Sequence, residues 1–209
     1  TKTGKKIREF PREKGHKRGI QALAFSPNGK QLVSVGKDDA IMVWNTAGGH
    51  PVKTISGNGA NFYGIDFLLN GSLATATLAE GMRVYSKSTF DLAAKMKVDS
   101  GQGANDIAVN PKGTIGVTAG RDGKVVVWDM KSRKALGSVQ AHSDWVLGVA
   151  FAPNGRIAVS CSTDSRLQVI DTKSLKTVAT VEGRAVVDSL VGVTSDGKYL
   201  LTTDGSNNL

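Results

Sequence analysis

The chain has 209 residues, of which 40% are hydrophobic and 22% charged, and its formal net charge is +9. No apolar run approaches the roughly 18 residues that a spanning helix needs, so we expect no membrane insertion; 25 Gly and only 5 Pro are typical of a soluble β protein. The single cysteine, Cys161, excludes an internal disulfide and favours a cytoplasmic or nuclear location.

The N-terminal segment carries most of the net positive charge. Residues 1–18 hold eight Lys or Arg against Glu9 and Glu13. Such a cluster suits phosphates of RNA or an acidic protein surface. The alternative is an exposed outer strand whose charges prevent edge pairing. The candidate anion or RNA contacts are Lys5, Lys6, Arg8, Arg12 and Lys14.

A tandem repeat runs along the chain with a period of 42 residues. Short apolar runs that lead into Gly-containing turns end at Phe25, Phe67, Val109, Phe151 and Val193. Three of the units read AFSPNGKQLVSVGKDDAIMVWN, VNPKGTIGVTAGRDGKVVVWDM and AFAPNGRIAVSCSTDSRLQVID. A period of roughly 40 to 45 residues with four strands per unit predicts propeller blades. Because no single blade buries both its faces, the blades must stack around a common axis.

We therefore predict an all-β fold, a single β-propeller segment over 1–209 whose four-stranded antiparallel blades number about five. Full repeats are expected at 16–56, 57–98, 99–140 and 141–182, and an incomplete repeat at 183–209. Residues 1–15 are interpreted as a basic lead-in with an outer strand at 5–10 (KKIREF), which makes nineteen strands. A complete ring of seven blades needs roughly 300 residues. We expect a segment of such a ring; the alternative is a self-contained five-bladed ring.

The spacing of Gly15-His16, Asp38 and Trp44-Asn45 resembles that of the WD-repeat family, and the resemblance covers essentially the whole chain. It implies a relay of hydrogen bonds inside each blade, from Trp through Ser or Thr and His to Asp. The relay is a structural device, because each of these buried polar groups needs a partner. By position its members are His16, Ser34, Asp38, Trp44, Thr118, Asp122, Trp128, His142, Ser160 and Asp164.

The repeat at 57–98 departs most from this pattern. It has Asn58 in place of His, Ala79 in place of Asp and Tyr85 in place of Trp. We expect this blade to be the least stable or the most adapted to a partner.

No catalytic, cofactor or metal site is predicted. His16 and His142 are assigned to the relay, and His50 sits in a Gly-Gly-His-Pro turn. No Cys/His set has metal-ligand spacing, and no Gly-rich loop precedes a helix. We expect a protein that is not an enzyme and takes neither a cofactor nor a small-molecule substrate.

The resemblance also implies which residues surround one mouth of the central channel. These are Lys17, Lys37, Asn61, Arg121, Ser143, Trp145 and Thr163. Trp145 is the strongest candidate, because large aromatic side chains at the centre of an interface carry most of the binding energy. The alternative is that it only packs over the adjacent loop. Lys37 and Arg121 predict a basic mouth that favours an acidic peptide or a phosphate-bearing ligand.

These observations predict a WD-repeat scaffold that mediates protein–protein interactions as a subunit of a larger assembly. One candidate assembly is a ribonucleoprotein or ribosome-biogenesis complex, in which the basic N-terminal cluster touches RNA. The alternative is a cytoskeletal or ciliary, microtubule-associated complex in which the subunit binds protein only.

Overall fold

A computed structural model describes residues 5, 6, 9–97, 102–183 and 187–204. This part of the chain is all-β apart from the short 3-10 helix η1 (Arg12–Lys14). It forms four antiparallel sheets of four strands and one of two strands, which we number blades 1 to 5 in chain order. The prediction of four-stranded propeller blades is confirmed.

The strands follow the repeat. Blade 1 contains β1 (Ile20–Phe25), β2 (Gln31–Gly36), β3 (Ala40–Asn45) and β4 (Pro51–Ser56). Blade 2 contains β5 (Phe62–Phe67), β6 (Leu73–Thr77), β7 (Gly81–Tyr85) and β8 (Leu92–Lys97). Blade 3 contains β9 (Ala104–Val109), β10 (Ile115–Gly120), β11 (Lys124–Asp129) and β12 (Lys134–Gln140). Blade 4 contains β13 (Val146–Phe151), β14 (Ile157–Ser162), β15 (Arg166–Asp171) and β16 (Lys176–Glu182), and blade 5 contains β17 (Val187–Val193) and β18 (Leu200–Asp204).

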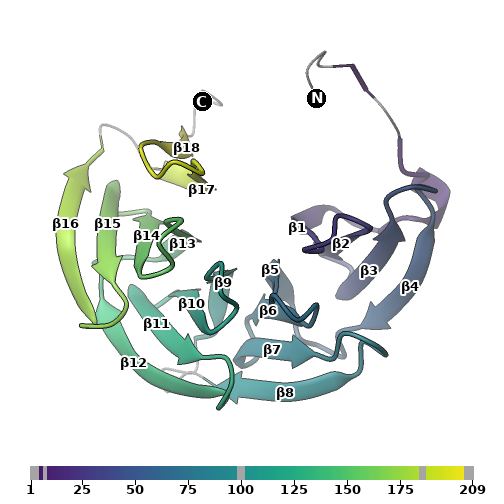
Figure 1. The fold of residues 1–209 in the computed structure, drawn as a ribbon, viewed down its shortest axis with the longest axis horizontal. Coiled ribbons are helices and arrows are strands. Elements are labelled where there is room, and N and C mark those ends of the chain that lie inside the picture. Colours follow the sequence, from purple (N-terminus) through teal and green to yellow (C-terminus); the bar gives the residue numbers. More distant parts are fainter. Residues whose placement is uncertain (1–4, 7–8, 98–101, 184–186, 205–209) are drawn as a thin grey trace.

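The blades lie side by side in an arc that does not close (Figure 1). The first strand of each blade is innermost and contacts the first strand of the next, from β1 through β5, β9 and β13 to β17. The fourth strands form the outer rim. Because successive strands are joined by turns, the two ends of every strand face opposite sides of the arc. One side therefore carries the turns after first and third strands, and the other carries the connections between blades.

The core lies between blades rather than inside them. Val33, Val35, Ile41 and Val43 of blade 1 pack against blade 2 in one cluster, together with Phe62, Leu73 and Tyr85. Equivalent clusters lie between blades 2 and 3 and between blades 3 and 4. Cys161 is also fully buried, on β14.

Two first-strand carboxylates reach into the following blade. Asp66 Oδ2 accepts a hydrogen bond from the backbone N–H of Val109 (2.8 Å), and Asp106 Oδ2 accepts one from the N–H of Val149 (3.0 Å). Burial raises the pKa of both groups, against these hydrogen bonds, and the pKa of Asp106 rises to about 7. Blades 2, 3 and 4 are thus joined by side chain–backbone bonds as well as by apolar packing.

The predicted outer strand at 5–10 is absent at its described residues. Lys5, Lys6, Glu9 and Phe10 belong to no strand, and Ile7 and Arg8 lie outside the described residues. An outer strand pairs with the third strand of its own blade, as β4 does with β3, and no described third strand is left for 5–10 to join. Phe10 instead packs edge-on against Trp44, with ring centres 5.5 Å apart. The described chain therefore has eighteen strands, where nineteen were predicted.

Candidate functional site

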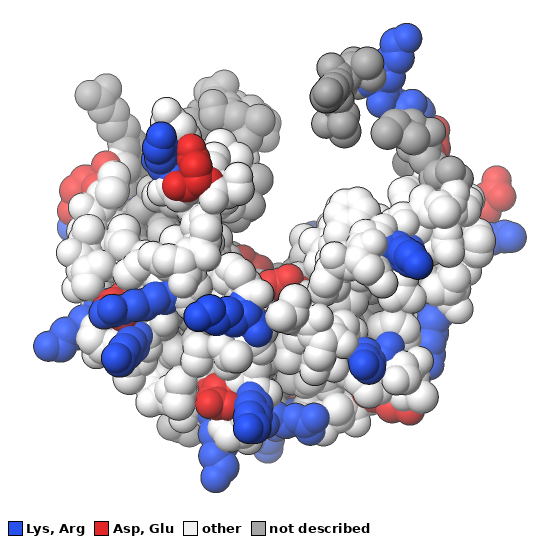
Figure 2. Space-filling model, viewed as in Figure 1, with Lys and Arg blue, Asp and Glu red and all other residues white. Residues whose placement is uncertain are grey.

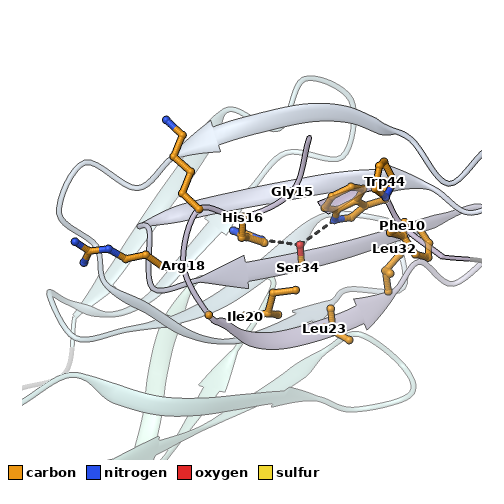
Figure 3. Close-up of a pocket in the computed structure, with 12 residues that line it drawn as sticks. Phe10, Gly15, His16, Arg18, Ile20, Leu23, Leu32, Ser34 and Trp44 are labelled. Carbon is orange, nitrogen blue, oxygen red and sulfur yellow. Dashed lines mark hydrogen bonds between the residues drawn. The ribbon is translucent and has the colours of Figure 1, made fainter. Parts of the chain in front are cut away.

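The relay of blade 1 connects four side chains. Trp44 Nε1 donates to Ser34 Oγ (2.8 Å), Ser34 Oγ lies 2.7 Å from His16 Nε2, and His16 Nδ1 lies 2.8 Å from Asp38 Oδ1. Figure 3 shows the Ser34 hydroxyl between His16 and Trp44. Because an ionised carboxylate can only accept hydrogen bonds, Nδ1 of His16 donates to Asp38.

This relay also fixes the loop before β1. Asp38 Oδ2 also accepts the backbone N–H of Lys17 (2.8 Å). Burial opposes ionisation of Asp38, but the hydrogen bonds from His16 and Lys17 outweigh burial and lower the pKa of the carboxyl. The charged carboxylate therefore ties the loop before β1 to the turn between β2 and β3.

Blade 4 has the same arrangement without the Trp. His142 Nδ1 lies 3.1 Å from both oxygens of Asp164, and Nε2 lies 2.9 Å from Ser160 Oγ. Burial lowers the pKa of His142, although Asp164 acts in the opposite direction. The lowered pKa favours the neutral imidazole. Asp164 Oδ2 accepts the N–H of Ser143 (3.1 Å), which anchors the loop that carries Trp145.

Blade 3 keeps only part of the relay. Trp128 Nε1 donates to Thr118 Oγ1 (2.9 Å). Asp122 accepts the N–H of Lys124 (3.2 Å) in its own turn. Ser100, which stands at the His position, lies outside the described residues.

Blade 2 replaces the relay with a buried ion pair. Arg83 Nε and Nη2 donate to the two oxygens of Glu80 (2.9 and 2.8 Å), and Nη1 donates to the carbonyl of Gly57 (2.5 Å). Both side chains are buried, and Lys95 Nζ approaches Glu80 at 3.0 Å. The hydrogen bond from Arg83 lowers the pKa of Glu80 to about 2, against burial. The pair ties the turn before β7 to the loop before β5, which is what the His–Asp contact does in blades 1 and 4.

Three side chains from three blades meet at the mouth, and we call them the mouth cluster: Tyr63, Arg121 and Trp145. The guanidinium carbon of Arg121 lies 5.1 Å from the centre of the Tyr63 ring and 4.8 Å from that of Trp145. Arg121 Nε donates to Asn105 Oδ1 (2.9 Å), and Asn105 Nδ2 donates to the carbonyl of Val146 (2.9 Å). The cation is therefore held in place between two aromatic rings.

The remaining predicted mouth residues divide into groups. Thr163 donates its N–H to the carbonyl of Trp145 (3.2 Å), beside Ser143. Lys37 and Asn61 line a hollow of about 270 Å³ that Tyr63 also lines. Lys17 lies apart from these residues. It lines a pocket of about 610 Å³, drawn in Figure 3, on the face of blade 1 that is turned away from blade 2.

Sequence reasoning missed Tyr63, which connects the mouth cluster to that hollow. Its position is the second of the first strand, where the other full blades have Gln21, Asn105 and Leu147. A single aromatic at this position was the available signal.

The expectation of a basic mouth needs correction. The turns between second and third strands, which include Lys37 and Arg121, also contain Asp38, Asp39, Glu80, Asp122 and Asp164. The charge of Arg121 is directed at two aromatic rings. The mouth is better described as aromatic with one held cation.

The basic N-terminal cluster is described only in part. Lys6 Nζ lies 2.8 Å from Glu9, with both side chains 73% exposed. Lys5 and Lys14 are exposed, whereas Arg8 and the side chain of Arg12 lie outside what the structure describes.

Two findings limit the chemistry of the described residues. They include no group of three or more His, Cys, Asp or Glu side chains placed to hold a metal ion. They also include no helix long and apolar enough to cross a membrane.

Comparison with known proteins agrees with the geometry of the blades and their relays. The family model for the WD domain, G-beta repeat, matches residues 4–45, 95–129 and 133–171, more than half of the chain. The chain belongs to the WD-repeat family. The matched segments reach the third strands of blades 1, 3 and 4, and blade 2, which has the ion pair, lies almost wholly outside them. WD-repeat domains are typically non-catalytic scaffolds that bind other proteins.

Several curated relatives are similar over part of the chain. The nuclear distribution protein nudF of Aspergillus niger is 28% identical over 144 residues, 66% of this chain and 32% of that protein. Pre-mRNA-processing factor 19 of Bos taurus is 25% identical over 148 residues, 66% of this chain and 28% of that protein. The ciliary WD repeat-containing protein ctxp80 of Euplotoides octocarinatus is 34% identical over 120 residues, 57% of this chain and 16% of that protein. The chain thus spans less than a third of each of these relatives.

Proposed function

We propose that this protein is a non-enzymatic WD-repeat scaffold that captures a protein partner at the channel mouth, as a subunit of a larger assembly. The mouth cluster carries the proposal. Trp145 is 46% exposed, although Arg121 lies over its ring. A large aromatic side chain at the centre of an interface, with an Arg beside it, is the typical composition of a binding hot spot.

The cluster is ordered before a partner arrives. Arg121 is held by Asn105 and by two rings, and the backbone of Trp145 is held by Thr163. A side chain that is already fixed loses little conformational freedom on binding, so more of the contact energy appears as affinity. The same cluster supports protein binding over catalysis, because it contains no acid–base pair.

Two kinds of assembly fit this scaffold in the cytoplasm or the nucleus. A ribonucleoprotein or ribosome-biogenesis complex is supported by the similarity to a pre-mRNA-processing factor and by the basic N-terminal segment. The alternative, a cytoskeletal or ciliary complex, is supported by the similarity to a nuclear distribution protein and a ciliary protein. Salt-dependent RNA binding that is lost on charge reversal of Lys5, Lys6 and Arg8 distinguishes the first from the second.

The mouth is tested by quantitative co-purification of the tagged chain from cells. We expect Trp145→Ala and Arg121→Ala to lose the same set of proteins. Leu92→Ala is the matched control, because Leu92 is 44% exposed on the outer strand β8, away from the mouth. Retention of every captured protein at wild-type level by both mouth variants would contradict the proposal.

A further inference from the structure

The side of the arc opposite the mouth is basic. Its turns, which follow first and third strands, face the viewer in Figure 1. The turns themselves contain two acidic residues, Asp91 and Asp196, and Asp129 and Asp171 end third strands on the same side. Figure 2 shows Lys and Arg spread over this side, with few Asp or Glu between them. The basic residues of these turns are Lys30, Lys87, Lys112, Lys131, Arg133, Arg156, Lys173 and Lys198.

Most of these cations are not neutralised by a neighbour. Within the described part of the chain, Arg156 is the one member of this set that forms an ion pair, with Asp171. Lys112 and Lys173 are exposed and form no ion pair there. Because these unpaired cations together create a positive potential over this side, it attracts an acidic partner.

A groove of about 560 Å³ lies between blades 3 and 4 on this side. Lys112 and Lys173 line it from the turns after β9 and β15. The groove is also lined by Ile115, Leu136 and Leu175, and Leu136 is 50% exposed. The groove thus combines apolar side chains with two unpaired ammonium groups.

A buried amide holds the groove in shape. Asn110 Nδ2 donates to the carbonyl of Gly155 in the neighbouring blade (3.1 Å). Asn110 Oδ1 accepts the N–H groups of Thr114 (2.9 Å) and Ile115 (3.2 Å). The turns after β9 and β13, which both line the groove, are therefore fixed relative to each other, which reduces the entropy lost on binding.

We propose that this groove binds an acidic peptide segment that carries an apolar side chain. Asp or Glu side chains pair with Lys112 and Lys173, and the apolar side chain packs on Leu136 and Leu175. A nucleic acid fits less well, because the residues that line the groove include no aromatic ring for base stacking. A sugar–phosphate chain would also leave the apolar floor unused, whereas each apolar side chain that covers it gains about 25 cal/mol per Å² buried.

The groove and the mouth lie at opposite ends of the same strand. Trp145 precedes β13 and the turn containing Arg156 follows it. A strand of this length spans about 20 Å at roughly 3.3 Å per residue. The two sites can therefore hold different partners at once, and the groove does not depend on what the mouth binds.

Fluorescence anisotropy of a labelled probe peptide, made of Asp and Glu around two central Leu, tests the groove on the full 209-residue chain. We expect saturable binding that the double variant Lys112→Glu/Lys173→Glu weakens by about tenfold or more. Leu136→Ser, and a probe with Ser in place of Leu, each weaken binding by about threefold or more. Lys30→Glu on the same side of blade 1 and Lys97→Glu on β8 are the charge-matched controls, and both retain binding.

Two outcomes would overturn the proposal. One is the absence of saturable binding to the wild-type chain, or undiminished binding by a Lys112→Glu/Lys173→Glu variant whose circular dichroism matches the wild type. The other is binding that responds to the Lys variants but not to Leu136→Ser, accompanied by tighter binding of an oligouridylate. That result would assign the groove to nucleic acid instead.

Discussion

The guanidinium carbon of Arg121 lies 4.8 Å from the centre of the Trp145 ring, although the two residues belong to neighbouring blades. Asn105, which holds Arg121, also donates to the backbone of Val146, next to Trp145. The orientation of the indole is therefore controlled by residues outside its own blade. This arrangement makes the mouth sensitive to substitutions that never touch a partner.

Arg121→Lys tests that control. A lysine keeps the charge but loses the planar guanidinium that stacks on both rings and bonds Asn105. We expect stability to fall by no more than about 1 kcal/mol, as for a partly exposed cation–π contact, while partner capture falls clearly. Thermal unfolding and co-purification measure the two effects. Equal capture by Arg121→Lys and wild type would show that Trp145 needs no support from Arg121.

The relay of blade 1 predicts an order of costs. Trp44→Phe removes one buried donor to Ser34 and costs about 1 kcal/mol. Ser34→Ala leaves the indole N–H of Trp44 and Nε2 of His16 without their shared partner, so it costs more, about 2 to 3 kcal/mol. Urea unfolding measures both. A Ser34→Ala variant as stable as Trp44→Phe would contradict the relay.

Arg83→Met tests the ion pair of blade 2. Met42 is the equivalent residue in blade 1, so the substitution suits a strand at this position. It leaves the Glu80 carboxylate buried without its bidentate partner, which costs about 3 to 5 kcal/mol. Lys95→Met removes a half-exposed partner of Glu80 and should cost less than about 1 kcal/mol. The double variant Glu80→Gln/Arg83→Met removes this charge and should be more stable than Arg83→Met. Equal stability of the two variants would show that the buried Glu80 carboxylate is not the cause of the loss.

Asp106 predicts a pH dependence. Burial raises its pKa from 3.8 to about 7. Between about pH 4 and 7 the folded state therefore holds a proton on Asp106 that the unfolded state has released. Stability from this group is therefore full below about pH 4 and is lost as pH rises toward 7. The loss amounts to at most about 4 kcal/mol, and less to the extent that water reaches the carboxylate.

Asp106→Asn removes this titration while retaining an oxygen for the N–H of Val149. Subtracting its unfolding free energies from those of the wild type between pH 4 and 8 isolates Asp106 from other groups. His142 acts in the opposite sense, because its lowered pKa reduces stability as pH falls below about 6.5. A pH-independent difference between the two proteins would refute the role given to Asp106.

Much of the fold could be read from the sequence because each blade obeys local rules. The 42-residue period placed the sheets, and residue types at fixed spacing located the relays of blades 1 and 4. The strand expected at 5–10 is not found at residues 5, 6, 9 and 10, because an outer strand depends on a pairing partner, which a local sequence pattern does not contain.

What the sequence did not reveal depends on neighbouring blades. Tyr63 and Arg121 are 58 positions apart in the sequence, and only the stacking of blades brings them together. Blade 2 was expected to be the least stable blade or the one most adapted to a partner, because its His and Asp are missing; the sequence pattern did not reveal that Glu80 and Arg83 form an ion pair there. The turns after first and third strands contain Lys or Arg in the sequence, but only the structure shows that these turns lie on the same side of the arc.

The bonds from Asp66 and Asp106 have an evolutionary consequence. Each carboxylate bonds to the main chain of the next repeat rather than to a side chain. Any residue except proline supplies that N–H, so the bond itself places no requirement on the side chain at the receiving position. Tandem copies that begin identical can in this way diverge in sequence while their attachment to one another is inherited intact.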